Sequence, residues 1–78
     1  MIDESYVNGV IKRYLRPVRK RSGLKQIDVG EAIGCGQNYI SHIELGRRAP
    51  SLIKLMRLCD CLGVTPNDLL GYSDTIRD

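Results

Sequence analysis

The chain has 78 residues, 42% of them hydrophobic, and carries a formal net charge of +3. A chain of this length suits one small domain, near the size at which a single hydrophobic core is only just large enough to stabilise the fold. The sequence shows no signal peptide and no apolar run of about eighteen residues, so we expect a soluble cytoplasmic protein without a membrane partner.

Charge is segregated along the chain. Between residues 12 and 57 lie eleven Lys or Arg and three acids, a net charge of +8, whereas the remainder carries one Arg and six acids, a net charge of −5. A basic middle with acidic ends is expected when one face meets phosphate groups and the ends do not. The alternative explanation is a solvated charged face with no partner.

Metal and enzyme chemistry find little support in the sequence. Three cysteines are an odd number, which argues against a disulfide framework, and Cys59-Asp60-Cys61 has the wrong spacing for a zinc knuckle. We expect Cys35 and Cys59 to be small buried thiols and Cys61 to be more exposed. With one histidine and no nucleophile–base set, we predict a protein that is not an enzyme and uses no metal or cofactor.

The first predicted helix begins near Asp3, a plausible cap, and runs to about Ser22, where Gly23 ends it. Its inward stripe is spaced by four, four and three residues: Val7, Ile11, Leu15 and Val18. Pro17 removes one backbone hydrogen bond and clashes with the carbonyl four residues earlier. The helix therefore either kinks there or consists of two pieces, and residues 1–10 form an N-terminal extension.

The most informative stretch covers residues 26 to 45. Apolar residues with helical spacing predict two short helices, over about 26–33 and 37–45. Gly34-Cys35-Gly36 between them suits a turn, because glycine is unfavourable inside a helix and tolerates positive φ. Gly30 supplies a position without a side chain where the helices would cross. Two short helices joined in this way predict a helix-turn-helix, whose second helix enters the DNA major groove.

Two further helices follow a basic loop. Ser51 is a good N-cap for a helix that Gly63 ends, and Thr65 caps a last helix with Pro66 at its first position. The predicted inward residues of these helices are Leu52, Leu55, Leu58, Cys59, Leu62, Leu69 and Leu70. Residues 72–78 are interpreted as a short polar tail.

An ordered series of motifs runs through the chain: GLKQ at 23–26, VG at 29–30, IGC at 33–35, QNYISHIELG at 37–46, RRAPSL at 47–52 and LGVTPNDLL at 62–70. This series, over about residues 11–71, resembles the phage repressor and Cro-like helix-turn-helix family of XRE-type transcriptional regulators. The resemblance implies a single all-α domain over 1–78, a compact five-helix lambda-repressor-like fold that docks on DNA operators as a dimer. It also implies a protein of bacterial or phage type that associates with the nucleoid.

The second helix of the motif supplies the candidate base-reading residues. Ile40 and Ile43 would face the core, so the opposite face carries Gln37, Asn38, Ser41 and His42. An amide can donate to and accept from adenine in a bidentate pair, which makes Gln and Asn well suited to reading bases. The resemblance agrees, because the first two residues of this helix commonly read bases in the family. Ordinary solvent exposure is the alternative for each.

Other residues are candidates for phosphate contacts, which position a domain without reading sequence. The resemblance implies that Gln26, at the start of the first motif helix, grips the DNA backbone. Tyr39 is expected to point outward beside the reading face, with its hydroxyl available to a phosphate. The basic candidates are Arg47 and Arg48 after the motif, then Lys25, and with less weight Arg21 and Lys54.

Arg19 and Glu44 have a different predicted role. In the resembled family, residues at these positions often form an ion pair that joins the first helix to the recognition helix. A carboxylate facing phosphates would be repelled, so a buried or paired Glu44 is also the better physical interpretation. We expect Glu44 to orient the recognition helix without touching DNA.

The leading hypothesis is a sequence-specific double-stranded DNA-binding regulator, a repressor that binds as a homodimer. An antitoxin or other protein-binding module with autoregulatory DNA binding is the alternative, supported only by the N-terminal extension, with Tyr6, Tyr14 and Pro17, and by the acidic tail. A controller protein of a restriction–modification system has the same chemistry. Either the last helix, near Leu69 and Leu70, or the N-terminal extension could supply the dimer surface; the resemblance favours the C-terminal helices.

Overall fold

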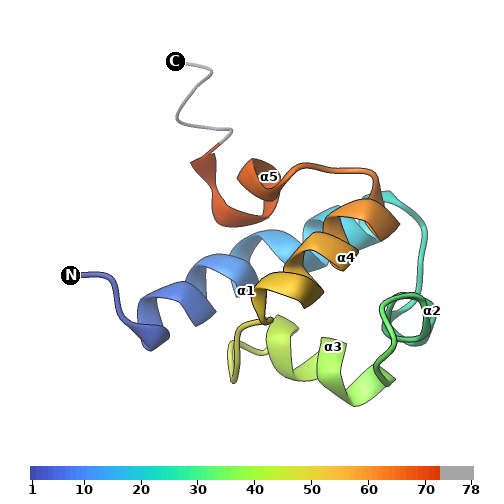
Figure 1. Ribbon diagram of the computed structural model, residues 1–78, viewed down its shortest axis with the longest axis horizontal. Helices are drawn as coiled ribbons and strands as arrows, with labels where there is room; N and C mark the ends of the chain where they lie inside the picture. Colours follow the sequence, from blue (N-terminus) through green and yellow to red (C-terminus); the bar gives the residue numbers. More distant parts are fainter. Residues whose placement is uncertain (73–78) are drawn as a thin grey trace.

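The computed structural model describes residues 1–72, and over this range helices joined by short turns and loops are the only regular secondary structure (Figure 1). Five helices follow one another: α1 (Glu4–Arg21), α2 (Gln26–Ala32), α3 (Gln37–Glu44), α4 (Leu52–Leu62) and α5 (Pro66–Leu70). The all-α, five-helix prediction is therefore confirmed for the described part of the chain. None of these helices is long and apolar enough to cross a membrane. Most of the predicted tail, residues 73–78, lies outside the described residues.

α1 is one helix. The Asp3 side chain caps it by accepting a hydrogen bond from the Tyr6 N–H at 2.9 Å. The helix continues through Pro17, whose ring is exposed, so the prediction of two separate pieces is wrong. The N-terminal extension forms the first turns of this helix. The predicted inward stripe faces the core, with Val7 half-buried and Ile11, Leu15 and Val18 buried.

The caps of the last two helices are those expected from the sequence. The Ser51 hydroxyl accepts from the Lys54 N–H at 3.2 Å, and the Asp68 carboxylate accepts from the Thr65 N–H at 3.0 Å. Gly63 ends α4 in the left-handed conformation, with φ of 68°. These local interactions fix where α4 and α5 begin and where α4 ends.

Leu52 is a correction to the predicted inward stripe of α4. Its side chain is 73% exposed, whereas Leu55, Leu58 and Leu62 are buried as predicted. Leu52 is the first residue of the helix and lies at the edge of the stripe that these leucines define. Leu69 is fully buried, but Leu70 is only half-buried.

The core is enclosed by all five helices. α1 passes between α5 and α3 and packs against both, while α4 packs against α2 and α5 (Figure 1). The central side chains, which have no exposed area, are Leu15, Val29, Ile40, Ile43, Leu58 and Leu69. The predicted anchor Leu24 packs against this core and is half-buried, as is Cys35, which lies in the α2–α3 turn and not in a fully buried position.

The crossing of α2 and α3 depends on Gly30. A Cβ atom at this position would lie 2.6 Å from the Gly36 carbonyl oxygen and 3.1 Å from the Gln37 nitrogen. These neighbours are backbone atoms at the start of α3, so no side-chain rotation can relieve the overlap. The predicted need for a small residue at the crossing is confirmed.

We expect Gly30→Ala to destabilise the protein by about 1–3 kcal/mol, because α3 must move away from α2 to admit one methyl group. The measurement is urea unfolding followed by circular dichroism. The matched control is Glu31→Ala, an exposed change in the same helix that should alter stability by less than about 0.5 kcal/mol. Equal stability of the two variants would show that the crossing tolerates a side chain.

Candidate nucleic-acid interface

α3 presents two different faces. Ile40 and Ile43 are fully buried on one face, while Gln37, Asn38 and His42 are exposed. Ser41, the fourth residue predicted to read bases, is half-buried. The helix therefore offers two amides and one imidazole to the surface, close to its N-terminal end, and is held to the core from behind.

Gln26 lies at the centre of a chain of hydrogen bonds that joins α2 to α3. Its amide nitrogen donates to Glu44 Oε1 at 3.1 Å, and its amide oxygen accepts from the Gln37 amide nitrogen at 3.4 Å. The side chain is half-buried and engaged at both ends. Sequence reasoning placed Gln26 at a phosphate and missed its bonds to Glu44 and Gln37, because only the folded approach of α2 and α3 creates them.

Arg19 and Glu44 form a bidentate ion pair between α1 and α3. Arg19 Nε lies 2.5 Å from Glu44 Oε2, and Arg19 Nη2 donates to Glu44 Oε1 at 3.0 Å. A third guanidinium bond, from Nη1, reaches the Leu24 carbonyl oxygen at 2.9 Å. Both charged residues are buried, with 8% and 7% of their surface exposed. Glu44 is therefore paired and buried, as expected from the sequence, and its role in orienting α3 stays a prediction.

The ion pair also changes the pKa of Arg19. The hydrogen bond from Arg19 to Glu44 raises the pKa of the guanidinium above its ordinary value, and the charge of Glu44 adds to this effect, whereas burial alone would lower it. Arg19 therefore stays charged and keeps its donors available to Glu44 and to the Leu24 carbonyl oxygen.

The residues predicted to contact phosphate lie around this face in different environments. Lys25, Arg47 and Arg48 are exposed. Tyr39 is half-buried and packs against the core, so it is less exposed than expected from the sequence, and the phosphate contact of its hydroxyl stays a prediction. Its ring lies 4.5 Å from the Arg48 guanidinium carbon, a cation–π contact that holds the α3–α4 loop beside α3.

Two cationic side chains of α4 bind the C-terminal end of α2. Lys54 Nζ and Arg57 Nη1 donate to the Ile33 carbonyl oxygen at 3.3 and 3.2 Å. Positive groups are favourable at the C-terminal end of a helix, where carbonyl groups lack partners. Lys54, a secondary candidate for phosphate, thus has a structural partner, and Arg57 was missed because its role depends on how α4 packs. Arg21 is exposed.

The thiols show no arrangement for metal or redox chemistry. Cys59 is buried and Cys61 is half-buried, and burial is the main reason that the pKa of each thiol is raised. Within residues 1–72, no three His, Cys, Asp or Glu side chains are grouped so that they could hold a metal ion. Among the described features, the candidate site is therefore the exposed face of α3 and the basic residues around it.

Comparison with known proteins decides the family. The family model described as Helix-turn-helix matches residues 15–69. The chain belongs to the XRE-type helix-turn-helix family. The uncharacterized HTH-type transcriptional regulator y4dJ of Sinorhizobium fredii is 39% identical over 57 residues, which cover 73% of this chain and 74% of that protein. The HTH-type transcriptional regulator DdrOP3 of Deinococcus deserti is 39% identical over 56 residues, covering 72% of this chain and only 43% of the relative.

Solved structures share the arrangement of this helix-turn-helix protein. The restriction–modification controller protein C.AhdI from Aeromonas hydrophila superposes with a TM-score of 0.72 and 28% identity, covering 77% of this chain and 91% of its own. The clp gene regulator ClgR from Corynebacterium glutamicum gives a TM-score of 0.80 and 25% identity, with 96% of each chain covered. The family is one of DNA-binding transcriptional regulators, a class of proteins that are not enzymes.

We expect Glu44→Ala to lower the free energy of unfolding by about 3–5 kcal/mol, because it leaves the Arg19 guanidinium buried without its partner. Thermal and urea unfolding measure this loss. Glu31→Ala, which removes an exposed carboxylate, is the control. An Arg19→Met, Glu44→Leu double variant should be more stable than Glu44→Ala, because no unpaired charge stays buried. An unchanged melting temperature for Glu44→Ala would contradict the structural role of the pair.

Proposed function

We propose that this chain is a sequence-specific regulator of transcription that reads the major groove of double-stranded DNA with α3, binds as a homodimer and acts as a repressor. The observation that carries the proposal is the composition of the exposed face of α3. Gln37, Asn38 and His42 are exposed there, while Ile40 and Ile43 anchor the helix to the core. A helix held from behind by fully buried side chains can enter a groove without losing its packing.

The exposed side chains suit base recognition. Gln and Asn amides can each pair bidentately with the N6 and N7 atoms of adenine, and an imidazole can donate to a guanine acceptor. Gln37 also bonds to Gln26 at 3.4 Å, a long contact that restricts the amide without occupying both of its ends. Its preferred orientation is thereby set before DNA binds. Pre-ordering of this kind reduces the entropy lost on binding.

The surrounding cations support phosphate binding on either side of the reading helix. Arg47 and Arg48 are exposed in the loop after α3, and Lys25 is exposed immediately before α2. The Arg48 guanidinium lies over the Tyr39 ring, and this contact keeps the guanidinium beside α3. We assign these three cations to backbone contacts, with Gln26 supporting Gln37 and contributing to the backbone contact at the start of α2.

A twofold arrangement would place two α3 helices in successive major grooves, about 34 Å apart. Repression follows where the bound site overlaps a promoter, since a bound dimer covers the duplex that a polymerase must open. Selection from random duplex libraries at about 150 mM salt tests the sequence-specific reading, because non-specific backbone attraction is weakened there. An enriched palindrome is the expected result. If affinity falls with salt and no sequence is enriched, sequence-specific reading is refuted.

We expect Gln37→Ala and Asn38→Ala each to weaken binding to the selected duplex by about 1–3 kcal/mol and to relax the preference at one position of each half-site. Repeating the selection with each variant shows both effects. Asn67→Ala is the matched control, because Asn67 is an exposed amide on α5, outside the reading helix. If Asn67→Ala and Asn38→Ala gave the same binding and sequence preference, the assignment of Asn38 would be wrong.

Arg47→Ala is expected to act differently. It should weaken binding to all duplexes by a similar factor and reduce the slope of log K against log salt by about 0.9, the value for one phosphate contact. Fluorescence anisotropy titrations at several salt concentrations measure the slope. Lys20→Ala, which removes an exposed cation of α1 that is not among the phosphate candidates, is the comparison. A loss confined to one duplex sequence would instead place Arg47 among the base-reading residues.

A further inference from the structure

We propose that the carboxylates of Asp3 and Glu4, at the start of α1, oppose the binding of DNA phosphates to the α3–α4 loop and so limit the affinity for duplexes of any sequence. The proposal rests on the proposed function, because it concerns the surface that the function assigns to DNA. It gives the start of the N-terminal extension a role that is neither base reading nor phosphate binding.

A hollow of about 800 Å³ lies between the start of α1 and the α3–α4 loop. From α1 it is lined by Asp3 and Glu4, and from the other side by three basic residues, His42, Arg47 and Arg48. His42 belongs to α3, and the two arginines follow this helix in the loop. The hollow therefore brings acidic residues of α1 to residues that the proposed function places on bases and phosphates.

The fold brings together charges that are segregated along the chain. In the sequence, a basic middle lies between two acidic ends. In the structure, the acidic N-terminal end lines the same hollow as the basic loop that follows the reading helix. A charge pattern along the sequence does not reveal this approach, because the residues that meet are far apart in the chain. The N-terminal end is therefore close to the phosphate candidates.

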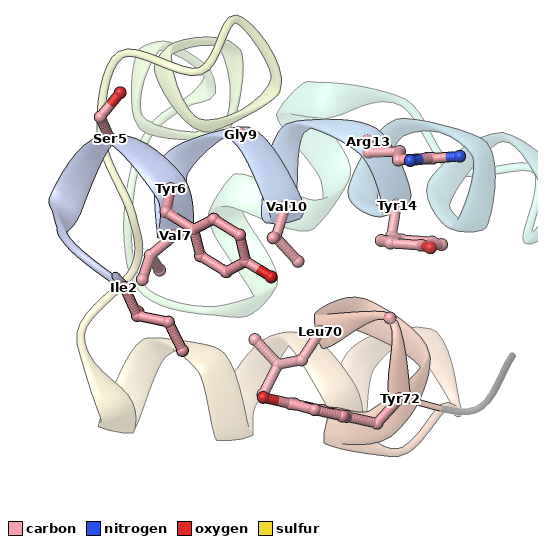
Figure 2. A pocket seen from close by; sticks show the side chains of 11 residues that line it. Ile2, Ser5, Tyr6, Val7, Gly9, Val10, Arg13, Tyr14, Leu70 and Tyr72 are labelled. Carbon is pink, nitrogen blue, oxygen red and sulfur yellow. The ribbon is translucent and has the colours of Figure 1, made fainter. Parts of the chain in front are cut away.

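The two sides of the first turns of α1 differ in chemistry. Figure 2 shows the side away from the loop, where Tyr6 lies across from Leu70 and Tyr72 at the end of the described chain. The residues that line the hollow on that side include no Asp or Glu. Asp3 and Glu4 are exposed and line the hollow beside the α3–α4 loop. The negative charge at the start of α1 is therefore on the side of the phosphate candidates.

Helix capping does not account for both charges. The Asp3 carboxylate accepts a hydrogen bond from the Tyr6 N–H at 2.9 Å, as a capping side chain does. Asparagine caps helices about as well as aspartate, so this cap does not require a negative charge. Glu4 is an exposed carboxylate in the first turn, where the helix dipole stabilises it only slightly. The stability of α1 therefore leaves most of the effect of these charges unexplained.

The charges around the hollow are not neutralised by ion pairs. Within residues 1–72, no ion pair involves Asp3, Glu4 or either arginine of the loop. Arg48 lies over the Tyr39 ring instead. Unpaired charges act on any ion that approaches the surface that they share. A phosphate that approaches Arg47 and Arg48 is therefore attracted by these arginines and repelled by the two carboxylates.

This repulsion has a range that matters at moderate salt. At about 0.1 M salt the Debye length is about 10 Å, so charges that share one hollow are screened only in part. Phosphates are present in every duplex, and contacts to them carry no sequence information directly. The repulsion should therefore lower the affinity for all duplexes by a similar factor and leave the base preference of α3 unchanged.

Fluorescence anisotropy titrations of the wild type, Glu4→Gln and Asp60→Asn with one non-specific duplex test the proposal. Asp60→Asn is the matched control, because it removes one exposed acidic charge from α4 at a position that does not line the hollow. At about 0.1 M salt we expect Glu4→Gln to tighten binding by about 3- to 10-fold, the effect of one charge several ångströms away in mainly aqueous surroundings. Asp60→Asn should change the affinity by less than about 2-fold. The gain from Glu4→Gln should shrink as salt is raised.

Two further variants locate the effect. Asp3→Asn keeps a capping side chain and should tighten binding in the same direction as Glu4→Gln. In a variant with both Arg47→Ala and Arg48→Ala, the gain from Glu4→Gln should fall below about 2-fold, because no phosphate is then held beside the carboxylate. Circular dichroism checks that each variant keeps the wild-type helix content.

Three results would overturn the proposal. Glu4→Gln and Asp60→Asn with equal affinity for DNA would refute it alone, and so would a gain from Glu4→Gln that persists without the two loop arginines. A wild type that binds no duplex at about 50 mM salt, where backbone attraction is strong, would refute the proposed function as well. The titration of the wild type therefore separates the two failures.

Discussion

The buried ion pair between Arg19 and Glu44 is the interaction on which the position of α3 in the candidate interface depends. It joins α1 to the last residue of α3, and Arg19 also holds the carbonyl of Leu24 before α2 begins. Burying two charges costs several kcal/mol per ion before their attraction is counted, so hydrophobic residues could supply similar stability. Hydrophobic contacts are not directional, whereas a bidentate ion pair fixes both the distance and the rotation of α3 relative to α1.

Gln26 connects this ion pair to the surface of α3 by hydrogen bonds. One oxygen of Glu44 accepts bonds from both Arg19 and Gln26, and Gln26 in turn accepts from Gln37. The series begins at a side chain with almost no exposed surface and ends at one that is exposed. A base-reading amide must be placed to within a fraction of an ångström, and on a short helix its own backbone cannot ensure this. The series Arg19, Glu44 and Gln26 therefore explains how a helix of only eight residues can hold the Gln37 amide in a preferred orientation.

Features set by neighbouring residues could be predicted from the sequence, and features set by distant contacts could not. The caps at Ser51 and Thr65 depend on residues three positions away, so local chemistry was sufficient. The burial of Ile40 followed from helical spacing alone. The partial burial of Tyr39 was missed because it depends on packing against the folded core, and the exposure of Leu52 was missed because periodicity does not reveal where the core ends.

α1 joins the ion pair to the core. Arg19 follows Leu15 by one helical turn, and Leu15 and Ile11 are buried among the other helices. Because an α-helix rises by a fixed amount per residue, the packing of these two side chains also sets the position of Arg19 along the core. The orientation of α3 therefore depends on the packing of α1 as well as on the two isoleucines of α3 itself.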